Sequence, residues 1–481
     1  MVASKSKDKP NVLFIMTDDQ GPWALGCAGN KEIITPHLDR LAAEGVRFDQ
    51  FFCTSPVCSP ARASVLTGQI PSQHGIHDFL RDADNARLTY LTGTAYTELL
   101  VEHGYTCGIS GKWGVGNDYA PQKGFSHWYV CMYDAGHYWN PPMVRNGEVI
   151  RETGYLTDLI TADALSFLEK QSQTEQPFYL SVNYTAPHHL WVGEHPQKFV
   201  DMYEDCAFES CPQEPEHPWF LPLTNPSTVR TDPVANLKGY FASVTAMDDG
   251  VGSLLGKLEQ LGLRDNTLIC FMSDNGFSCG HHGIWGKGNG TYPQNMYDNS
   301  VKVPAIFSHP GRIPAGRVDS SLLSQYDFMP TLLEYLNIPH PLASELPGSS
   351  FSHILQGDSS DDRQHVVVYD EYGPVRMIRT PEYKYVHRFP FGPFEFYDMK
   401  ADPEERNNLY DHPDVQDRIA ELYRRLEDWF LHFVNPAMDG ARLPVTGTGQ
   451  SQMVGSALTD HRTFNQNGRL YKLRTDSQAT S

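Results

Sequence analysis

Short continuous apolar runs alternate along the chain with longer segments whose apolar residues recur at helical spacing. The apolar runs predict strands at 11–16, 105–110, 178–182 and 266–272. Helical spacing predicts helices at 36–44, 96–103, 157–171, 234–261 and 327–336. Alternation of this kind is typical of an α/β fold, so we expect a large central, mostly parallel sheet flanked by helices.

The pattern changes near residue 363, where the apolar runs become shorter and turns follow one another closely. Short strands are predicted at 366–370, 375–378, 383–386 and 394–397. A helix is predicted over 413–433, so this part should form a smaller C-terminal antiparallel sheet with one helix packed on it. We therefore divide the chain into a main domain (1–362), a subdomain (363–436) and an extension (437–481).

Two segments show no clear period. Residues 194–233 are rich in proline, glutamate and aromatic residues, which indicates a long surface excursion, and long loops in compact domains are often functional. The extension has several glycines among polar residues and few apolar anchors. Three outcomes stay open for it: disorder, packing around the body, or contact with a neighbouring subunit.

Composition and charge limit the partners of this chain. Its 481 residues are 40% hydrophobic and 20% charged, as in ordinary globular proteins, and its formal net charge is −20. Nucleic acids and anionic membranes require an extended basic surface, so we expect neither as a partner. The sequence does not determine the oligomeric state.

The N-terminus and the cysteines bear on the compartment. Residues 1–10 are polar and basic, with no apolar segment long enough for a signal peptide or a membrane span. As written, the chain is therefore expected to be cytoplasmic, or exported if a leader has been trimmed. The nine cysteines show no zinc-like spacing, and only Cys206 and Cys211 are close enough in sequence to suggest a local disulfide.

Acidic and amide side chains follow two of the predicted strands. Asp18 and Asp19 come after the first strand, and Asp274 and Asn275 come after the strand at 266–272. A single acidic pair is usually part of a solvated turn, but this explanation is less satisfactory for two polar pairs that each follow a buried strand. Since sites gather at the carboxyl ends of parallel strands, these residues could form an all-oxygen cage for a hard cation such as calcium.

Basic residues and histidines follow the same kind of strand. Lys112 lies after the strand at 105–110, His188 and His189 lie after the strand at 178–182, and Lys287 follows the Asp274 turn. A lone lysine or histidine is usually a surface or structural residue. Their shared position after strands places them with the acidic residues.

Residues 58–62 read Cys-Ser-Pro-Ala-Arg and lead into a predicted helix that continues to Gly68. A single cysteine is more often a small buried side chain than a reactive group. This run, however, matches the signature of the type I sulfatases. With the strand-end residues, the chain resembles the sulfatase branch of the alkaline phosphatase superfamily from Asn11 to about Asn435. Further family-like runs lie at 35–41, 297–304, 396–398, 402–405 and 408–409.

The resemblance implies an alkaline phosphatase-like fold and a sulfuric ester hydrolase. It implies that a maturation enzyme oxidises Cys58 to formylglycine, whose hydrated aldehyde is the nucleophile, and that Arg62 stabilises the ionised diol. The residues implied to grip the sulfate are Lys112, His188 and Lys287. The implied ligands of one calcium ion are Asp18, Asp19, the modified residue 58, Asp274 and Asn275.

These residues also make physical sense together. The transition state of sulfate ester cleavage gathers negative charge, so catalysis depends on preorganised positive charge, to which the N-terminus of a helix at 60–68 would add. We expect one diol oxygen to attack sulfur while His188 supplies a proton to the departing alcohol. The hemiacetal sulfate then collapses, which divides one hard step into two.

One position departs from the family pattern. Most relatives have a histidine two residues after the lysine of the Gly-Lys-Trp motif, where it is thought to help the hemiacetal break down, but this chain has Gly114. His137 and His189 are candidate replacements, and each could instead contact substrate or pack structurally. The residues that we expect to contact substrate are His137, Trp139, His189 and His282.

Three functions stay open from the sequence. The favoured one is a formylglycine-dependent sulfatase acting on a small or oligomeric sulfated carbohydrate, because a net charge of −20 would repel long polyanions. An aryl sulfate substrate is a variant of it. The alternatives are a phosphomonoester or phosphonate ester hydrolase on the same scaffold, and a non-catalytic glycan-binding relative with an unconverted Cys58.

Overall fold

The protein is seen here as a computed structural model, and its main feature is a ten-stranded sheet. The described residues are 9–80, 91, 93–132, 136–221, 228–358, 363–369, 373–452, 454 and 463–464. Four parallel strands form the middle of the sheet in the order β9 (Thr267–Ser273), β1 (Asn11–Thr17), β8 (Phe178–Asn183) and β4 (Thr106–Gly111). These strands are almost wholly buried, as their continuous apolar runs predict.

Shorter strands extend the sheet on both sides. Beyond β9 lie β12 (Ala305–Ser308), β2 (Val46–Phe48) and β13 (Arg317–Asp319), and beyond β4 lie β5 (Phe125–Cys131), β6 (Pro142–Arg145) and β7 (Glu148–Arg151). Both β12 and β6 run antiparallel to their two neighbours. The sequence did not reveal these strands, because five of them have only three or four residues and the apolar run of β5 is interrupted by Ser126 and His127. The prediction of a large, mostly parallel sheet is confirmed.

Alternate side chains of β1 enter two different hydrophobic cores. Leu13 and Ile15 belong to one core, and Val12, Phe14 and Met16 belong to the other. Successive side chains of a strand point to opposite faces, so a strand that is apolar throughout requires cover on both sides.

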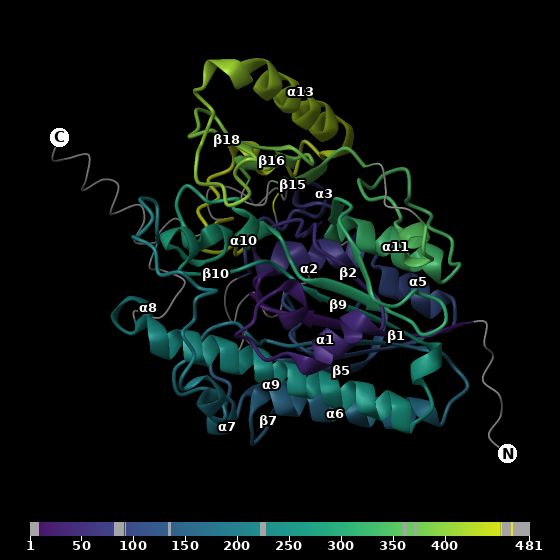
Figure 1. Ribbon diagram of the computed structural model, residues 1–481. Coiled ribbons are helices and arrows are strands. Elements are labelled where there is room, and N and C mark those ends of the chain that lie inside the picture. The colour runs from purple at the N-terminus through teal and green to yellow at the C-terminus, as the bar shows by residue number, and fades with distance from the viewer. Residues whose placement is uncertain are drawn as a thin grey trace.

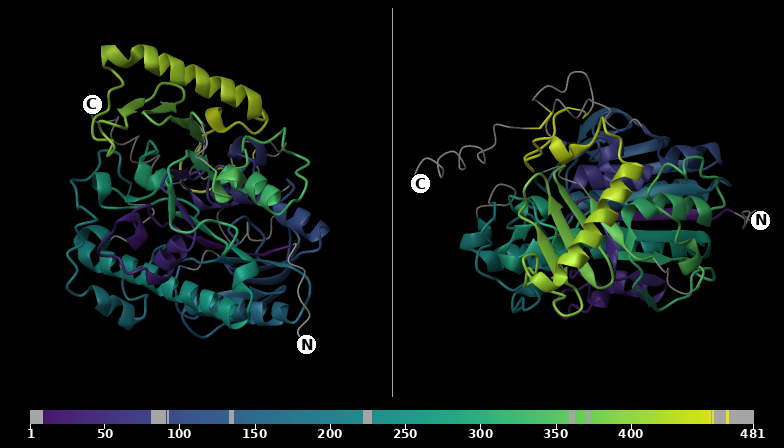
Figure 2. Two further views of the ribbon diagram at one scale, coloured as in Figure 1. Left: turned by 45° about the vertical axis from the view of Figure 1, so that its right-hand side comes forward. Right: turned by 90° about the horizontal axis from the view of Figure 1, so that it is seen from above.

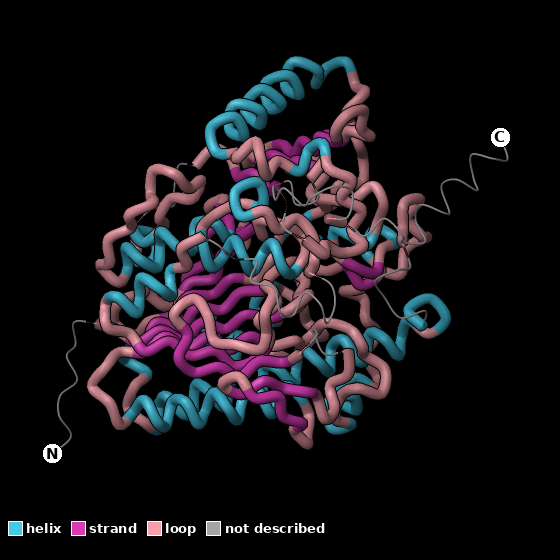
Figure 3. The backbone as a smooth tube through the Cα atoms, turned by 180° about the vertical axis from the view of Figure 1, so that it is seen from behind, coloured by secondary structure: helices cyan, strands magenta, loops and turns pink. Residues whose placement is uncertain are grey.

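Helices supply this cover on both faces of the sheet (Figure 1). On one face lie α1 (Pro36–Ala43), α6 (Leu156–Ser172) and the long α9 (Pro233–Gln260). Helices α1 and α6 contact strands of the sheet, and α9 contacts both of these helices. On the other face lie α2 (Cys58–Thr67), α5 (Tyr96–Glu102) and α11 (Phe328–Tyr335). Figure 3 shows the sheet from behind, with helices on either side of it. The helices expected from apolar periodicity are all present, with ends that differ by a few residues.

Several short elements connect this frame. The short strands are β3 (Phe51–Phe52), β10 (Ser278–Cys279), β11 (Trp285–Gly286) and β14 (Leu323–Ser324). The short helices are α3 (Pro71–His74), α7 (Gln197–Val200), α8 (Thr228–Thr231), α10 (Asp298–Val301) and α12 (Ser352–Leu355). None of the helices in the described part of the chain is long and apolar enough to span a membrane.

A second sheet forms near the C-terminus, as the sequence predicts. Four antiparallel strands follow one another: β15 (Val366–Tyr369), β16 (Val375–Arg379), β17 (Tyr383–Arg388) and β18 (Glu395–Asp398). The last residue of the first predicted strand, residue 370, lies outside the described residues. Helix α13 (Gln416–Phe433) lies across these strands (Figure 2).

A buried ion cluster joins the small sheet to the main body. Lys384 of β17 is fully buried, and its ammonium group lies 2.6 Å from Asp298 Oδ1 at the start of α10 and 2.5 Å from Glu405 Oε1. Glu405 also accepts a hydrogen bond of 2.7 Å from the backbone N–H of Asp298. Two of the family-like runs, at 297–304 and 402–405, therefore meet at one contact between the two sheets.

The segment 194–233 is more deeply packed than a surface excursion. Phe199, Tyr203 and Phe208 are buried in the core that α9 covers, although residues 222–227 lie outside the described residues. The proposed local disulfide is wrong, because Cys206 and Cys211 are both free thiols in this structure. The aromatic residues of this segment therefore serve as anchors to α9.

Candidate active site

The carboxyl ends of β1 and β9 bring the four predicted metal ligands together. The two strands pair in parallel with Thr17 opposite Ser273, so the residues that follow them lie side by side. Asn275 Nδ2 donates to Asp19 Oδ1 at 2.7 Å, and the backbone N–H of Asp19 donates to Asp274 Oδ1 at 3.3 Å. Asp19 has a φ of 62°, in the left-handed region, which turns the chain sharply after the strand.

These side chains fit a hard divalent cation. Carboxylate oxygens of Asp18, Asp19 and Asp274 all lie within 4.8 Å of one another, and all three residues are buried. Burial and the neighbouring charge of Asp18 raise the pKa of Asp274 to about 6, as expected where acids crowd together without full compensation. Carboxylate and amide oxygens are the donors that calcium or magnesium prefers.

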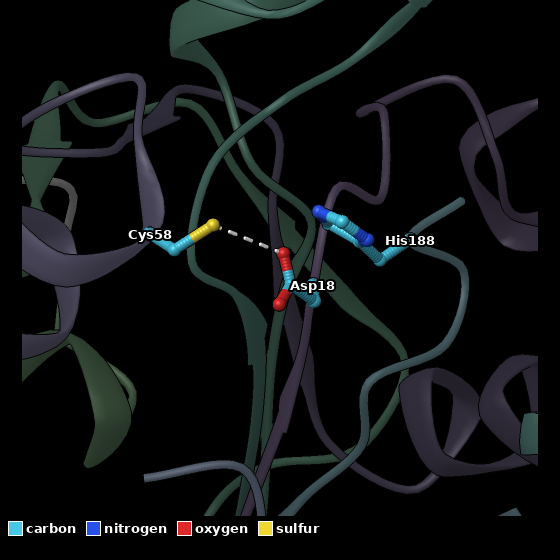
Figure 4. Close-up of side chains that lie close together, drawn as sticks. All are labelled: Asp18, Cys58 and His188. Atoms are coloured by element: carbon cyan, nitrogen blue, oxygen red, sulfur yellow. Dashed lines mark hydrogen bonds between the residues drawn. The ribbon is translucent and has the colours of Figure 1, made fainter. Parts of the chain in front are cut away.

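Cys58 is the first residue of α2 and lies beside this cluster. Its Sγ atom is 3.3 Å from Asp18 Oδ1 and 2.8 Å from Lys287 Nζ. Figure 4 shows the sulfur directed at Asp18, with His188 on the other side of that carboxylate. The position at a helix N-terminus adds partial positive charge at the sulfur.

An unmodified thiol is a poor nucleophile at this position. Burial and the negative charge of Asp18 raise the pKa of the Cys58 thiol well above its ordinary value. Only the thiolate attacks, so the thiol would stay protonated and inert at neutral pH. The surroundings therefore favour a modified side chain as the reactive group, and Sγ marks the position of its oxygens.

Three basic side chains surround the acids. Lys112 Nζ lies 2.6 Å from Asp18 Oδ2, and the Arg62 guanidinium contacts Asp274 Oδ2 through Nε at 2.9 Å and Nη2 at 2.8 Å. Burial opposes ionisation of Asp18, but the charges of Lys112, His188 and Arg62 outweigh it and hold the pKa of this carboxyl well below its ordinary value. The site is thus strongly charged although it is buried.

Lys287 lies between the predicted ligands. Its ammonium group is 2.5 Å from Asp19 Oδ1 and 3.3 Å from Asn275 Oδ1, and it contacts Cys58 Sγ. Burial opposes this charge, but the carboxylates of Asp19 and Asp18 stabilise it, so that the pKa of Lys287 is raised. The structure therefore gathers all five residues predicted as catalytic and all predicted ligands into one contiguous cluster.

The histidine pair at 188–189 adjoins the cluster. His188 Nε2 lies 3.7 Å from Asp19 Oδ2, and its Nδ1 bonds the carbonyl oxygen of His189 at 2.8 Å. The two rings stack with centroids 4.2 Å apart. Burial and the positive charge of His188 hold the pKa of His189 well below its ordinary value, so His189 is neutral at physiological pH.

His137 and Trp139 lie on the solvent side. The His137 side chain is 75% exposed and bonds Glu194 Oε1 at 2.8 Å, while Trp139 is 43% exposed and packs against Tyr155. Tyr138, between them, donates its hydroxyl to the carbonyl oxygen of His188 at 2.6 Å. This exposed pair is therefore linked to the cluster through Tyr138.

His282 stands apart from the other predicted substrate contacts. Its ring stacks on Tyr297 with centroids 3.9 Å apart, and Tyr297 belongs to a small apolar group with Ile284, Tyr397 and Met399. Burial and the charge of Arg406 lower the pKa of His282 to about 4. These contacts are those of a packed structural residue.

The conformation at Gly114 explains the missing family histidine. Gly114 has a φ of +74°, and a Cβ atom there would lie 3.0 Å from Arg62 Cδ and 3.3 Å from Lys112 Cε. An L residue is strained at this φ, and its side chain would displace two basic groups of the cluster. In this chain the space that a histidine would need is filled by Arg62 and Lys112.

The sequence analysis missed two residues that hydrogen-bond the backbone of the turns carrying the acidic residues. Tyr240 of α9 donates its hydroxyl to the carbonyl oxygen of Asp19 at 2.9 Å and accepts from the Gly21 N–H at 3.0 Å. Gln325 donates to the carbonyl oxygens of Ser273 and Asp274 at 2.9 and 2.8 Å. Tyr240 lies within a helix, and Gln325 follows only the two-residue strand β14, so neither comes after an apolar run that the sequence reveals.

The fold and the cluster define an alkaline phosphatase-like hydrolase, with a reactive position at a helix N-terminus beside an acidic cage. Comparison with known families makes this more specific. The family model described as "Sulfatase" matches residues 10–338, and "N-sulphoglucosamine sulphohydrolase, C-terminal" matches residues 280–430. The chain belongs to the sulfatase family and is a sulfatase of the alkaline phosphatase superfamily, and this membership supports a formylglycine-type mechanism.

Individual relatives agree with this membership. An N-acetylglucosamine-6-O-sulfatase of Bacteroides thetaiotaomicron is 30% identical, over 87% of this chain and 86% of its own length. An ulvan-active sulfatase of Formosa agariphila is 33% identical, over 87% and 80%. A structure solved with its substrate D-glucosamine-2-N,6-O-disulfate is 27% identical, covers 88% of this chain and 98% of that one, and has a TM-score of 0.75.

Proposed function

We propose that this sulfatase removes sulfate from a small sulfated carbohydrate. The names of the two relatives and the sugar bound in the related structure support a sugar substrate. The observation that carries the proposal is the contact of Asp18 and Lys287 with residue 58 at the buried start of α2, with Lys112 paired to Asp18 beside it. A net charge of −20 favours a short substrate over a long polyanion.

In this proposal residue 58 and a calcium ion supply the reactive chemistry. Oxidised to formylglycine and hydrated, residue 58 would offer a hydroxyl as nucleophile in place of the inert thiol. A calcium ion held by Asp18, Asp19, Asp274 and Asn275 would add positive charge that stabilises the anionic transition state. A maturation enzyme is the implied partner, and since α2 is buried throughout, it would reach Cys58 only before this helix packs.

The basic residues of this chain would bind and orient the sulfate. Lys112, Lys287 and Arg62 are each at least 94% buried, because their exposed fractions are 1%, 6% and 2%. Charges in a buried site act more strongly on an anion than they would in water. Negative charge that develops on the sulfate oxygens would thus meet fixed positive groups.

His188 would give a proton to the departing alcohol. Its Nδ1 faces the carbonyl oxygen of His189, which can only accept a hydrogen bond, so Nδ1 carries a hydrogen. The proton to be transferred is therefore the one at Nε2, the atom that lies 3.7 Å from Asp19. A proton donor placed beside the reacting ester is what general acid catalysis requires.

A substrate panel tests the proposed function. Purified protein is incubated with N-acetylglucosamine 6-sulfate, a sulfated ulvan oligosaccharide, an aryl sulfate and the matching phosphate esters, and released sulfate or phosphate is measured. We expect turnover of a sugar sulfate well above that of its phosphate analogue. Faster release of phosphate would instead favour a phosphoesterase on the same scaffold, and release from the aryl sulfate alone would remove the sugar assignment.

Metal removal tests the calcium site separately. Treatment with EGTA should abolish turnover and lower the unfolding midpoint, because a bound cation stabilises only the folded state. Calcium should restore both, and magnesium less well, since four protein oxygens in one cage suit the larger ion. Full activity in EGTA would contradict the site.

A further inference from the structure

The segment after α13 lies outside the residues matched by the family models, which end at 338 and 430. Its described residues 435–452, here called the C-terminal strap, run against the body of the protein. The backbone N–H of Asn435 donates to the Ser72 carbonyl oxygen at 3.0 Å, and His77 Nε2 bonds the Met438 carbonyl oxygen at 2.8 Å. Of the three outcomes left open for the extension, these residues follow the second, packing around the body.

We propose that Gln450 of the C-terminal strap is a positioning residue for residue 58, which makes the strap part of the active site. This inference rests on the proposed function, since positioning matters for turnover at residue 58. It goes beyond that function because it assigns a role to a segment outside both family matches.

Gln450 fastens the loop formed by residues 75–80. Its side chain is fully buried; Oε1 accepts from the backbone N–H groups of His77 and Asp78 at 2.8 and 3.3 Å, and Nε2 donates to the Gly75 carbonyl oxygen at 2.9 Å. Its backbone N–H donates to the Phe79 carbonyl oxygen at 2.7 Å. One buried amide thus satisfies several polar groups of a loop that has no regular secondary structure.

The fastened loop contacts the residue after the nucleophile position. The backbone N–H of Leu80 donates to Ser59 Oγ at 3.1 Å, and Leu80 also forms a parallel bridge with Gln450. Asp78 reinforces the arrangement, because Oδ1 accepts from the Phe79 N–H at 2.8 Å and Oδ2 accepts from the Gly449 N–H at 3.0 Å. A continuous chain of hydrogen bonds therefore runs from Gln450 to Ser59.

The strap also packs on the residue before the nucleophile position. Val57 is fully buried in a small hydrophobic cluster with Val445, Val454 and Phe464, all from the C-terminal extension. Val57 and Ser59 flank residue 58, so the same segment holds both neighbours, one by apolar contact and one through the loop. The start of α2 is thereby fixed by residues far away in sequence.

A third contact reaches the turn that follows Lys287. Gly447 has a φ of +73°, and a Cβ atom there would lie 3.2 Å from Asn289 Cβ and 3.3 Å from Gln294 Nε2. Asn289 belongs to the single helical turn Gly288–Gly290 directly after Lys287. The C-terminal strap therefore lies against the start of α2, which carries residue 58, and against the turn after Lys287, whose ammonium group contacts Cys58 Sγ.

This placement matters because a catalytic group tolerates little displacement. A misplacement of about 1 Å can reduce turnover by about a hundredfold. Residue 58 contacts Asp18 and Lys287 at 3.3 and 2.8 Å, and α2 itself has no side-chain cap at its N-terminus. The loop and the strap supply the restraint that a capping residue would otherwise give.

The test is Gln450→Met, which keeps the size of the side chain and removes its polar atoms. With N-acetylglucosamine 6-sulfate, we expect kcat to fall about tenfold and KM to change by less than about threefold. Rates are divided by the fraction of residue 58 that mass spectrometry finds converted. Hydrogen exchange should accelerate in peptide 57–67 and stay unchanged in the strand peptide 267–273.

Two further variants sharpen the test. Gln260→Met, at the exposed end of α9, is the matched control and should change neither kcat nor exchange. Ser59→Ala breaks the same link at its other end, so it should lower kcat to a similar extent, and the double variant should lower it no further. Additive losses would show that the two residues act independently, against the proposal.

The outcomes separate the strap from the proposed function. If the wild-type chain turned over no sulfate ester, the function would fail, while the exchange comparison would still decide whether Gln450 holds α2. Equal kcat and exchange in Gln450→Met and Gln260→Met would overturn the positioning role. Equal acceleration of exchange in 57–67 and 267–273 would overturn it too, because Gln450 would then act on global stability only.

Discussion

At the scale of single residues, Cys58 differs from the other buried cysteines in its neighbours. Asp18 and Lys287 contact its sulfur, whereas Cys270 of β9 is surrounded by apolar side chains, and burial alone raises the pKa of its thiol. Charged groups around a buried sulfur are costly unless they serve a reaction, so the environment separates a reactive position from a packed one.

The pair Cys58→Ala and Cys270→Ala tests this difference. Cys58→Ala should reduce turnover more than about a thousandfold with a change in unfolding free energy of about 1 kcal/mol, because only one buried atom is lost. Cys270→Ala should lose similar stability and keep its turnover. Sulfate release and urea unfolding measure the two effects, and residual wild-type rates in Cys58→Ala would contradict the assignment.

Gly114 and Gly104 form a second matched pair. Both have a positive φ, +74° and +87°, so alanine at either position should cost about 1–2 kcal/mol of backbone strain. A Cβ at Gly104 would meet no atom within 4 Å, whereas at Gly114 it would press on Arg62 and Lys112. We expect kcat/KM to fall about tenfold in Gly114→Ala only. Equal kcat/KM in the two variants would show that the space at Gly114 is not needed.

At the scale of elements, two parallel strands and one long helix place the site. The pairing of β1 with β9 sets their two acidic ends side by side, and Tyr240 of α9 fastens the turn after β1. Helix α9 also approaches the segment that carries His188, because a Cβ at Gly239 would lie 2.4 Å from the Trp191 carbonyl oxygen. Helix α9 therefore contacts the turn that carries Asp19 and the segment that carries His188, and it also covers one face of the sheet.

Two glycines within α9 test this close approach. Gly239→Ala should destabilise the protein by about 1–3 kcal/mol through overpacking and should lower turnover, because it displaces the chain next to His188. Gly256→Ala, where a Cβ would meet nothing within 4 Å, should stabilise by about 0.5–1 kcal/mol through helix propensity alone. Thermal unfolding and turnover of both variants are compared. Stabilisation by Gly239→Ala would refute the close contact.

At the scale of the whole molecule, two of the contacts that join the C-terminal part to the main body differ in kind. The buried cluster of Lys384, Asp298 and Glu405 connects the small sheet to α10, and the C-terminal strap connects the segment after α13 to α2. The family-like run at 402–405 thus has a structural role, since Glu405 compensates a buried lysine. Both connections lie outside the catalytic cluster and act on the arrangement of the segments around it.

Lys384→Met tests the first connection against an exposed counterpart. Removing the buried ammonium group leaves the buried Glu405 carboxylate without its cation and leaves Asp298 with the more distant Lys302, 3.9 Å away, so we expect a loss of about 3–5 kcal/mol in unfolding free energy. Lys400→Met removes an exposed pair with Glu382, 2.8 Å apart, and should not change stability measurably. Urea unfolding measures both, and equal stability of the two variants would mean that the buried cluster contributes little.

The four central strands of the large sheet and the residues that gather in the cluster could be predicted from local sequence. The strands β1, β8 and β9 are continuous apolar runs, and polar residues directly after them mark the ends where sites form. The predicted bond between Cys206 and Cys211 is absent, because closeness in sequence does not set the distance between two thiols. His282 stacks on Tyr297 in the structure, and its contact with substrate stays a prediction.

The sequence by itself determined the central strands, the motif at residues 58–62 and the family. Each of these depends on residues that are adjacent in the chain, so each can be recognised without knowing which distant residues it contacts. Only the tertiary structure decided that Gln450 lies against the loop that contacts Ser59, that Tyr240 holds Asp19, and that Gly114 must stay small beside Arg62. The physical reason is that these contacts join residues remote in the chain, and close packing and hydrogen bonding across such distances leave no periodic trace in sequence.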